Sequence, residues 1–177
     1  MNEVDIKKYK PVDFGNTQDL KDFFHIEITW EKPVKWADFE GLKKPFIYAI
    51  INSHKNRKHG PEIQYVGITE NGNSRFKQKD YEGKLSIGNY TSISVGNVSS
   101  QQKIKLRYMG RETLEQLEHI FIWALCDKHI LYNYKKQDTL PGWGLNGTEA
   151  YHITNRGFRF WQKMPREVIY PWILVRN

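Results

Sequence analysis

The stretch PFIYAIINSHKNRKHGPEIQYVGIT (45–69) determines which fold we predict. Its two ends, residues 45–52 and 62–69, are short runs rich in β-branched and aromatic residues, and Pro, Gly, Asn or Ser bounds each run. This composition is typical of β-strands, so we predict a hairpin. The connection SHKNRKHGP (53–61) is longer than the usual turn of about two to five residues and is basic. It is either a loop that reaches a phosphate backbone or a solvated tip.

Three further elements are predicted downstream of the hairpin. RFKQKDY (75–81) follows polar residues that are suited to cap a short helix. Residues 82–102 are rich in Gly, Ser and Asn, which predicts an irregular loop with room for one strand at TSISV (91–95). KIKLRYM (103–109) alternates polar and apolar residues with a period of two, so it is the best candidate for a third strand.

The clearest predicted helix is LEQLEHIFIWALCDKH (114–129), in which apolar residues recur at helical spacing. Thr113 and Gln116 form a T-x-x-Q capping box at its start. The apolar face of this helix has to pack on the sheet. Further along, REVIYPWILV (166–175) is bracketed by prolines and predicts an edge strand. The first 40 residues are patterned too weakly to assign.

Length and composition favour one domain over residues 1–177. The mass of 21.0 kDa is typical of a chain with a single core, and six Trp, ten Tyr and nine Phe supply apolar surface for it. The single cysteine, Cys126, excludes a disulfide framework and any zinc site that needs two thiolates; we expect it to be a buried structural thiol. The N-terminus lacks an apolar leader and no apolar stretch is as long as a membrane span, so we expect a cytosolic protein without a membrane partner.

The charge is unevenly distributed and nominates a nucleic acid as partner. The net charge is +7, although residues 1–40 contain nine acids and only six bases. Basic runs concentrate further on, and in RGFRFWQKMPR (156–166) they alternate with Phe and Trp. Cations mixed with aromatic rings suit phosphates and bases, whereas the alternative is a generically basic, solvated surface. The candidate nucleic-acid contacts outside 156–166 are Lys55, Arg57, Lys58, His59, Lys77, Lys103, Lys105 and Arg107.

Two strings in the hairpin resemble a known motif. PFIY (45–48) and QYVG (64–67) resemble the two halves of the GIY-YIG nuclease motif, with Phe46 in place of the usual first Gly and Val66 in place of the usual Ile. The resemblance extends over residues 45–133, the nuclease-like core. It leaves residues 1–44 as an N-terminal extension and residues 134–177 as a C-terminal extension that we expect to contact DNA.

Further residues match the family in order and spacing. Arg75 lies ten residues after Tyr65, where the family has its arginine, and Glu118 resembles the metal-binding glutamate of the family. Asn133 resembles the closing asparagine of the motif. Lys79 stands where the family often has a histidine, so that supporting role is changed. The resemblance implies an α/β fold of the α+β type, with a small central antiparallel or mixed β-sheet flanked by helices.

Each step of phosphodiester hydrolysis then has a candidate residue. Tyr48 or Tyr65 is the general base, which needs help from cations because a tyrosine of pKa ~10 is only about one part in a thousand phenolate at neutral pH. Arg75 offers a bidentate guanidinium to the scissile phosphate, and Lys79 adds positive charge there or restrains the base. Glu118 is the ligand of Mg²⁺ or Mn²⁺, which takes phosphate oxygens and water as its other ligands.

The resemblance implies a Mg²⁺-dependent endonuclease acting on double-stranded DNA. The length leaves no room for a separate DNA-binding module, so the chain resembles a stand-alone, site-specific type II restriction enzyme of a bacterium or phage. A palindromic site would require a homodimer. The alternatives are an inactive nucleic-acid-binding module that retains the fold, and a structural or protein-interaction domain.

Several residues also have ordinary structural interpretations. Tyr48 and Tyr65 occur in strands where aromatic residues are common, and Glu118 lies on a helix where a glutamate is usually solvated. Glu115 competes with Glu118 for the metal, and Asn146 is a weaker rival of Asn133. The chain contains no H-E-x-x-H string and no phosphate-cradling nucleotide loop, which disfavours a metalloprotease and a P-loop nucleotidase.

Overall fold

The computed structural model describes residues 24–53, 60–70, 87–100, 111–126, 133, 151–170 and 174–176. Its strands are β1 (Phe24–Trp30), β2 (Val34–Lys35), β3 (Phe46–Asn52), β4 (Glu62–Thr69), β5 (Thr91–Ser100), β6 (Tyr151–Gly157), β7 (Glu167–Tyr170) and β8 (Leu174–Arg176). The helices are α3 (Arg111–Cys126) and two 3₁₀ turns, η4 (Trp36–Asp38) and η6 (Phe160–Gln162).

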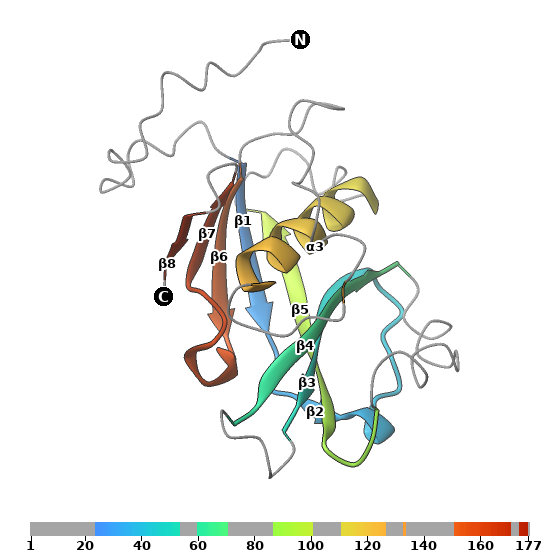
Figure 1. Cartoon of the computed structure of the whole chain (residues 1–177). Coiled ribbons are helices and arrows are strands. Elements are labelled where there is room, and N and C mark those ends of the chain that lie inside the picture. Colours follow the sequence, from blue (N-terminus) through green and yellow to red (C-terminus); the bar gives the residue numbers. More distant parts are fainter. Residues whose placement is uncertain are drawn as a thin grey trace.

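All eight strands belong to one strongly curled sheet with the order β4-β3-β5-β1-β6-β7-β8, and β2 pairs with β5 outside this path. The pair β1–β6 is parallel and the other pairs are antiparallel, so the sheet is mixed. Figure 1 shows α3 lying across one face of this half-barrel. The predicted mixed sheet is therefore present, but it is larger than expected, and α3 is the one α-helix among the residues described.

The predicted hairpin is confirmed at one end of this sheet. Strand β3 covers 46–52 and β4 covers 62–69, and the two pair antiparallel as expected. Strand β4 forms one edge of the sheet, and β3 lies between β4 and β5. All seven residues of β3 are buried, which explains why its sequence is almost continuously apolar.

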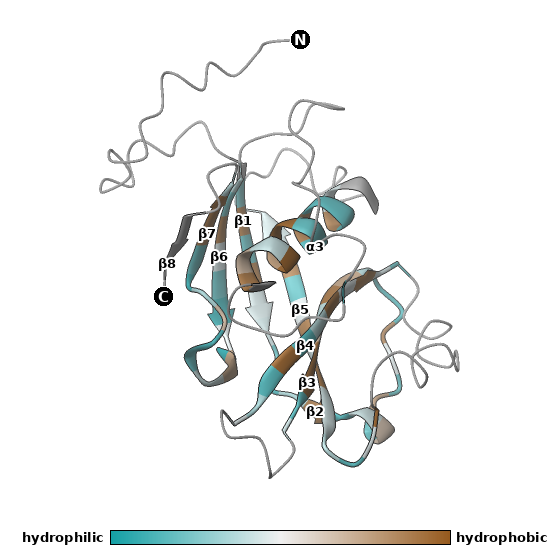
Figure 2. Cartoon of the chain, viewed as in Figure 1, coloured by the Kyte–Doolittle hydropathy of each residue, from teal (hydrophilic) through white to brown (hydrophobic). Residues whose placement is uncertain are grey.

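The core consists of two apolar clusters on opposite faces of β3. The larger cluster contains Ile47, Ala49 and Ile51 of β3, apolar residues of β1, β4, β6 and β7, and the buried side of α3. The smaller cluster contains Phe46, Tyr48 and Ile50 together with side chains that precede β3 or belong to β5. Successive residues of a strand point to opposite faces, so one strand supplies both clusters. Figure 2 shows the apolar colour along β3 and on the sheet-facing side of α3.

Three strands, β1, β2 and β6, were not predicted from the sequence, and two of them, β1 and β6, lie in the interior of the sheet. Strand β1 pairs with β5 on one side and with β6 on the other. The β1 sequence FHIEITW alternates apolar and polar residues, and Ile26, Ile28 and Trp30 are at most 2% exposed. The same sheet thus runs through residues from 24–30, from the hairpin and from 151–176.

The helix and the third strand differ in detail from the prediction. Helix α3 begins at Arg111, so Thr113 lies inside it and the predicted capping box is wrong. The side chain of Gln116 instead accepts a hydrogen bond from the Tyr151 hydroxyl and links α3 to β6. The possible strand at 91–95 is confirmed, and it continues as β5 to Ser100, where an irregular loop was expected. Ser94 donates a hydrogen bond to the Glu31 carbonyl over 2.7 Å. The predicted strand 103–109 and helix 75–81 lie outside the residues described.

The C-terminal strand prediction is confirmed in part. Residues 166–175 form two antiparallel strands, β7 and β8, and not one. Strand β8 is at the edge of the sheet, as expected for a segment interrupted by Pro171. No helix in the part of the chain that is described has the length and apolar character needed to cross a membrane.

The turn between β6 and β7 has an unusual backbone. Phe160, Trp161 and Gln162 have φ angles of 49°, 56° and 68°, in the left-handed region that L-residues avoid. Each such residue costs roughly 1–2 kcal/mol, so surrounding contacts have to hold the turn. Phe160 is fully buried and packs edge-to-face on Trp30, with ring centroids 5.2 Å apart.

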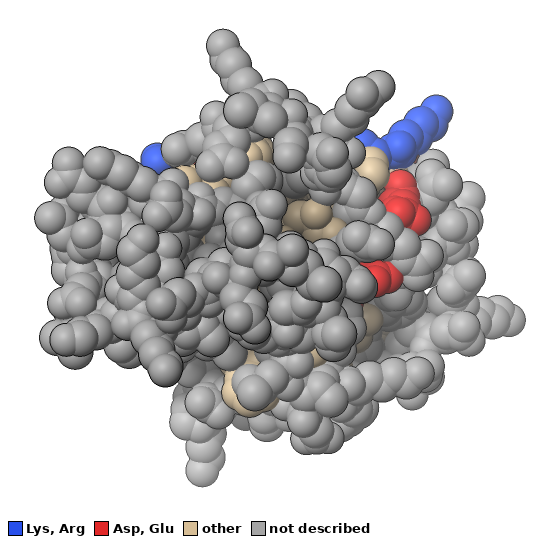
Figure 3. Space-filling model, turned by 90° about the horizontal axis from the view of Figure 1, so that it is seen from above, with Lys and Arg blue, Asp and Glu red and all other residues tan. Residues whose placement is uncertain are grey.

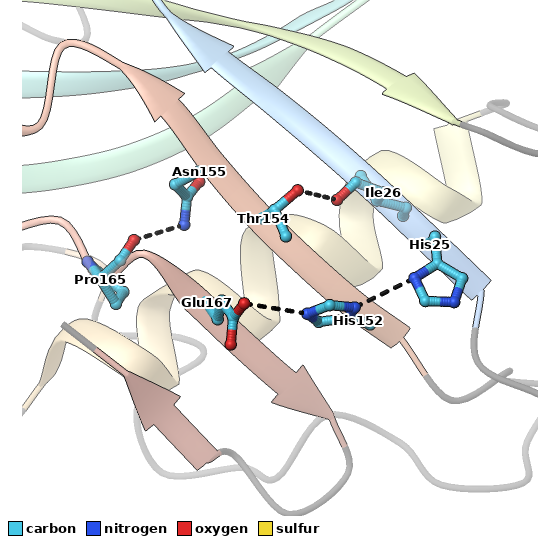
Figure 4. A network of polar contacts seen from close by, with 7 residues as sticks. All are labelled: His25, Ile26, His152, Thr154, Asn155, Pro165 and Glu167. Carbon is cyan, nitrogen blue, oxygen red and sulfur yellow. Dashed lines mark hydrogen bonds and ion pairs between the residues drawn. The ribbon is translucent and has the colours of Figure 1, made fainter. Parts of the chain in front are cut away.

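Asn155 fastens both ends of this turn. Its side-chain oxygen accepts a hydrogen bond from Trp30 Nε1 over 2.9 Å, and its side-chain nitrogen donates to the Pro165 carbonyl over 2.9 Å. Its backbone nitrogen donates to the Arg166 carbonyl over 2.7 Å. Figure 4 shows the amide of Asn155 directed at Pro165 across the start of β7.

We predict that Asn155→Ala destabilises the protein by about 2–4 kcal/mol, because it leaves the buried Trp30 N–H and the Pro165 carbonyl without partners. The matched control is Asn97→Ala. The Asn97 amide likewise makes two hydrogen bonds, to the side chains of Lys44 and Glu31, but both bonds are exposed. We expect it to cost less than about 1 kcal/mol. Urea unfolding measures the free energy of unfolding of both variants. Equal losses of stability would contradict a stabilising role of the Asn155 hydrogen bonds, which we call the Asn155 clasp.

Candidate active site

Tyr48 and Tyr65 lie side by side on the same face of the hairpin. Their rings are stacked, with centroids 6.1 Å apart and an angle of 27° between the planes. Both belong to the smaller cluster, on the face of β3 and β4 opposite α3. Tyr48 is fully buried, whereas Tyr65 is partly exposed. Of the two phenols, Tyr65 is therefore the one that a solvent-borne substrate can approach.

The glycine of the second motif string lies against both rings. Gly67 is the cross-strand partner of Tyr48 and stands two residues after Tyr65, so all three share one face. A Cβ atom on Gly67 would lie 2.5 Å from the Tyr48 hydroxyl oxygen and 2.7 Å from Cε1 of Tyr65. No side chain fits in this space. The glycine thus allows two tyrosines to stack over one position of an edge strand.

A β-bulge before Tyr65 sets which residues of β4 face the tyrosine side. The register shifts so that Ile50 pairs with Tyr65 and Ile51 pairs with Ile63, which leaves Gln64 as the extra residue. Ile63 and Val66 can then both pack in the larger cluster while Tyr65 points the other way. Gln64 is 2% exposed, and its side-chain oxygen accepts no hydrogen bond from the residues that the structure describes. Sequence reasoning did not find this bulge.

The Asn133 side chain is hydrogen-bonded to strand β4 at Val66, between Tyr65 and Gly67. Its Oδ1 accepts a hydrogen bond from the Val66 backbone nitrogen over 3.0 Å, and its Nδ2 donates to the Val66 carbonyl over 2.6 Å. The amide therefore pairs with an edge strand as a neighbouring peptide would. The residue is 8% exposed, and the two bonds connect positions 67 residues apart in the chain. A role limited to ending the loop after α3 does not account for this contact.

Glu118 is buried and not a solvated helix residue. It is 7% exposed and lies one helical turn from Leu114 and Phe121, on the side of α3 that faces the sheet. Its rival Glu115 is more exposed. Helix α3 packs mainly on the edge strand β4, on the face opposite the tyrosines. The shortest route from Glu118 to the Tyr65 face is consequently around the β4 edge.

The other predicted site residues lie outside the described part of the chain. These are the arginine and lysine of the motif and the candidate nucleic-acid contacts in three basic segments, namely Arg75, Lys79, Lys55, Arg57, Lys58, His59, Lys77, Lys103, Lys105 and Arg107. Asn146 and Cys126, apart from the helical backbone of the latter, are also outside it. The structure thus brings together Tyr48, Tyr65 and Asn133 around β4 and adds Gly67.

The described residues contain no group of three acids, histidines or cysteines arranged to hold a metal ion. These residues therefore do not form a site that encloses an ion entirely with protein ligands. Mg²⁺ needs no such enclosure, because it keeps several waters and takes phosphate oxygens. A single buried carboxylate such as Glu118 fits that requirement in type and number.

A second polar cluster lies on the outer face of β1, β6 and β7. His25 and His152 are direct partners on parallel strands, and their Nδ1 atoms are 3.1 Å apart. Nε2 of His152 lies 3.7 Å from a carboxylate oxygen of Glu167, as Figure 4 shows. The alternation in FHIEITW and YHITN is the signal that could have placed both histidines on one face.

The comparisons with known proteins add no family. No family model matches the chain, and neither a curated protein nor a solved structure matches it. The function therefore has to be inferred from the motif residues and their geometry.

We predict that Gly67→Ala destabilises the protein by about 1–3 kcal/mol or more, because the added methyl group forces the stacked tyrosine rings apart. Gly88→Ala is the matched control, since a Cβ atom there meets nothing within 4 Å. Chemical unfolding monitored by near-ultraviolet circular dichroism reports both stability and ring packing. An unchanged tyrosine signal in Gly67→Ala would contradict the close contact.

We also predict that Asn133→Ala costs about 2–4 kcal/mol, since it removes both hydrogen bonds to Val66 and leaves backbone groups of β4 unsatisfied. Hydrogen exchange at the Val66 amide should accelerate in this variant. Asn89→Ala, at an exposed turn residue before β5, serves as the control and is expected to change stability by less than about 0.5 kcal/mol. If Val66 exchange is the same in both variants, the Asn133 contact does not hold the strand.

Proposed function

We propose that the protein is a Mg²⁺-dependent endonuclease of the GIY-YIG type that hydrolyses phosphodiester bonds in double-stranded DNA. The observation that carries the proposal is the contact set around β4. Tyr48 and Tyr65 stack over Gly67, and Asn133 pairs with the backbone of Val66, which lies between Tyr65 and Gly67 in β4. Residues that match the motif at three separate places in the sequence thus converge on one strand.

Tyr65 is the general base in this proposal. It is partly exposed, whereas Tyr48 is fully buried and serves to position the Tyr65 ring. A phenol of ordinary pKa is about one part in a thousand deprotonated at neutral pH, which costs about 4 kcal/mol. Cations beside Tyr65 have to offset this cost. Arg75 and Lys79 come six and ten residues after the end of β4, and we assign them to that role.

The remaining steps concern the phosphate and the leaving oxygen. The Arg75 guanidinium is suited to bind two oxygens of the scissile phosphate and to hold it in line with the attacking water. The Glu118 carboxylate would hold Mg²⁺ beside the β4 edge. When bound, the ion polarises a phosphate oxygen and stabilises the leaving 3′ oxygen. The expected products carry a 5′-phosphate and a 3′-hydroxyl.

The finer proposal is a site-specific restriction enzyme. The charge excess downstream of residue 40 favours a polyanionic substrate. In the view from above, the acidic atoms that are visible lie at the right, and the upper of them are next to Lys or Arg atoms, as Figure 3 shows. Recognition of a palindromic site would require two copies of the chain, each cutting one strand.

One observation favours a second candidate, an inactive DNA-binding module. Helix α3 and Glu118 belong to the face of the hairpin opposite the tyrosine pair. If the Glu118 carboxylate does not reach around β4, the metal and the general base remain separated. The protein would then retain a basic surface without cleaving its ligand.

Cleavage of mixed-sequence plasmid DNA with Mg²⁺ tests the proposal. We expect discrete fragments from the parent protein and a loss of about 10²–10⁴-fold in rate for Tyr65→Phe, which removes the proton acceptor and keeps the ring. Glu118→Gln should also abolish cleavage while DNA binding persists. Tyr90→Phe, at an exposed tyrosine of the β5 turn, is the control and should cut at the parent rate.

The outcomes separate the candidates. DNA binding by the parent protein without cleavage under Mg²⁺ or Mn²⁺ supports the inactive module. Cleavage that survives Tyr65→Phe overturns the assignment of the base. Absence of any salt-dependent DNA affinity overturns both candidates and supports a structural or protein-interaction domain.

A further inference from the structure

The β6–β7 turn, residues 158–166, presents an indole ring to solvent. Trp161 is 52% exposed, more than any other large hydrophobic side chain in the described residues. Its neighbour Phe160 is fully buried, so the turn directs one aromatic ring into the core and the next one outward. Phe158 contacts Trp161 edge-to-face, with ring centroids 5.2 Å apart. The loop lies at the lower left of Figure 1.

The left-handed backbone is what directs Trp161 outward. Phe160, Trp161 and Gln162 all have positive φ, and together they are the complete set of such non-glycine residues in the described chain. Strained conformations of this kind persist where the surroundings impose them, and they cluster at functional sites. The sequence provides no glycine at Trp161, although glycine would adopt this backbone without strain.

The turn is rigidly attached at its base. Phe158 donates a backbone hydrogen bond to the Trp30 carbonyl over 2.9 Å. A Cβ atom on Gly157 would lie 2.3 Å from that same carbonyl oxygen, so the chain runs directly against β1. The Asn155 clasp holds the other end. A ligand that binds Trp161 therefore finds the ring already in place and loses little conformational entropy.

The turn itself carries charge of one sign. Residues 156–166 contain Arg156, Arg159, Lys163 and Arg166 and no acid. Arg156 pairs with Glu27 outside the turn, whereas Arg166 is exposed and Arg159 is partly exposed. The Nε atom of Arg159 is buried and donates to no acceptor among the described residues, so a ligand has to approach the terminal nitrogens of that guanidinium. A phosphate oxygen is an acceptor that also matches the charge.

The turn also lies next to the start of the motif strand. The Nζ atom of Lys163 donates a hydrogen bond to the Pro61 carbonyl over 2.6 Å, immediately before β4 begins. Tyr65 follows four residues after Pro61 in the same segment. The turn is thus attached to the beginning of β4, the strand that carries Tyr65.

An exposed indole surrounded by arginines matches nucleic acid better than protein. Aromatic rings stack on bases whatever their sequence, and the flanking cations neutralise phosphates. A protein-binding Trp is usually the centre of a wider apolar patch. Here Phe158 is the apolar contact of Trp161, and the other exposed or half-buried side chains of residues 159–166 are basic or polar, namely Arg159, Gln162, Lys163 and Arg166.

We propose that Trp161 stacks on a base that is unpaired or turned out of the bound DNA and that the Arg159 guanidinium binds an adjacent phosphate. The inference deepens the proposed function, because it assumes DNA as the substrate and names the side chains outside the motif that hold it. It also gives the left-handed turn a purpose: to hold the ring in a fixed position that faces solvent.

Fluorescence anisotropy with a short labelled duplex that carries one unpaired base, without divalent metal and over a range of salt, tests the proposal on the full chain. Trp161→Ala should weaken binding by about 5- to 150-fold, the effect of losing one stacked base, with the salt dependence unchanged. Trp161→Phe should restore most of the affinity. Arg159→Gln should weaken binding and lower the slope of log affinity against log salt by about one.

Controls separate stacking from folding. Trp161→Gly should weaken DNA binding as Trp161→Ala does but leave the melting temperature unchanged or higher, because glycine relieves the positive φ. A purely structural tryptophan would lower the melting temperature in both variants. Tyr90→Ala, at another exposed aromatic ring, should bind DNA like the parent protein.

Each result bears on one proposal or on both. Parent-like binding by Trp161→Ala overturns the stacking role, even if the parent protein cleaves DNA. Weakened binding by Trp161→Ala in a protein that never cleaves supports the stacking role and overturns the nuclease. If the parent protein binds no DNA and instead captures a protein through Trp161, both proposals are overturned.

Discussion

The structure depends on the burial of β3 on both of its faces. One face has to meet α3 and the large cluster, and the other has to meet the small cluster that contains Tyr48 and Tyr65. Hydrophobic burial on one side thus fixes the strand, and the fixed strand holds the tyrosines on the other side. A shift of β3 by one residue would move each of its side chains to the opposite face. The register of β3 with β4 and β5 therefore also determines which residues form the site.

The elements that the sequence predicted are those determined by local pattern. The hairpin 45–69 and the apolar stripe of α3 could be assigned because the strand composition and the helical spacing are read within one short window. The box at Thr113 failed because α3 begins at Arg111, before Thr113, and the Gln116 side chain bonds Tyr151, a residue 35 positions away. Similarly, 91–100 looks irregular by composition, yet its Ser and Gly residues pair with strands on both sides.

The same limit applies to the candidate site. Tyr48, Tyr65, Glu118 and Asn133 could be named from spacing, but the sequence could not indicate that Tyr48 is inaccessible or that Glu118 lies behind the hairpin. The burial of each depends on segments that contact it from far along the chain. The Gln64 bulge and the Gly67 contact are likewise products of pairing between strands, which no single stretch of sequence records.

The parallel pairing of β1 with β6 has a consequence for synthesis. Strand β1 leaves the ribosome early, but its neighbour β6 is made more than a hundred residues later, and its other neighbour β5 also comes afterwards. Until both arrive, FHIEITW is an apolar segment with open hydrogen-bonding groups on each side. Long-range pairing of this type slows folding. The unpaired edges of β1 therefore make the nascent chain a target for chaperones until β5 and β6 have been synthesised.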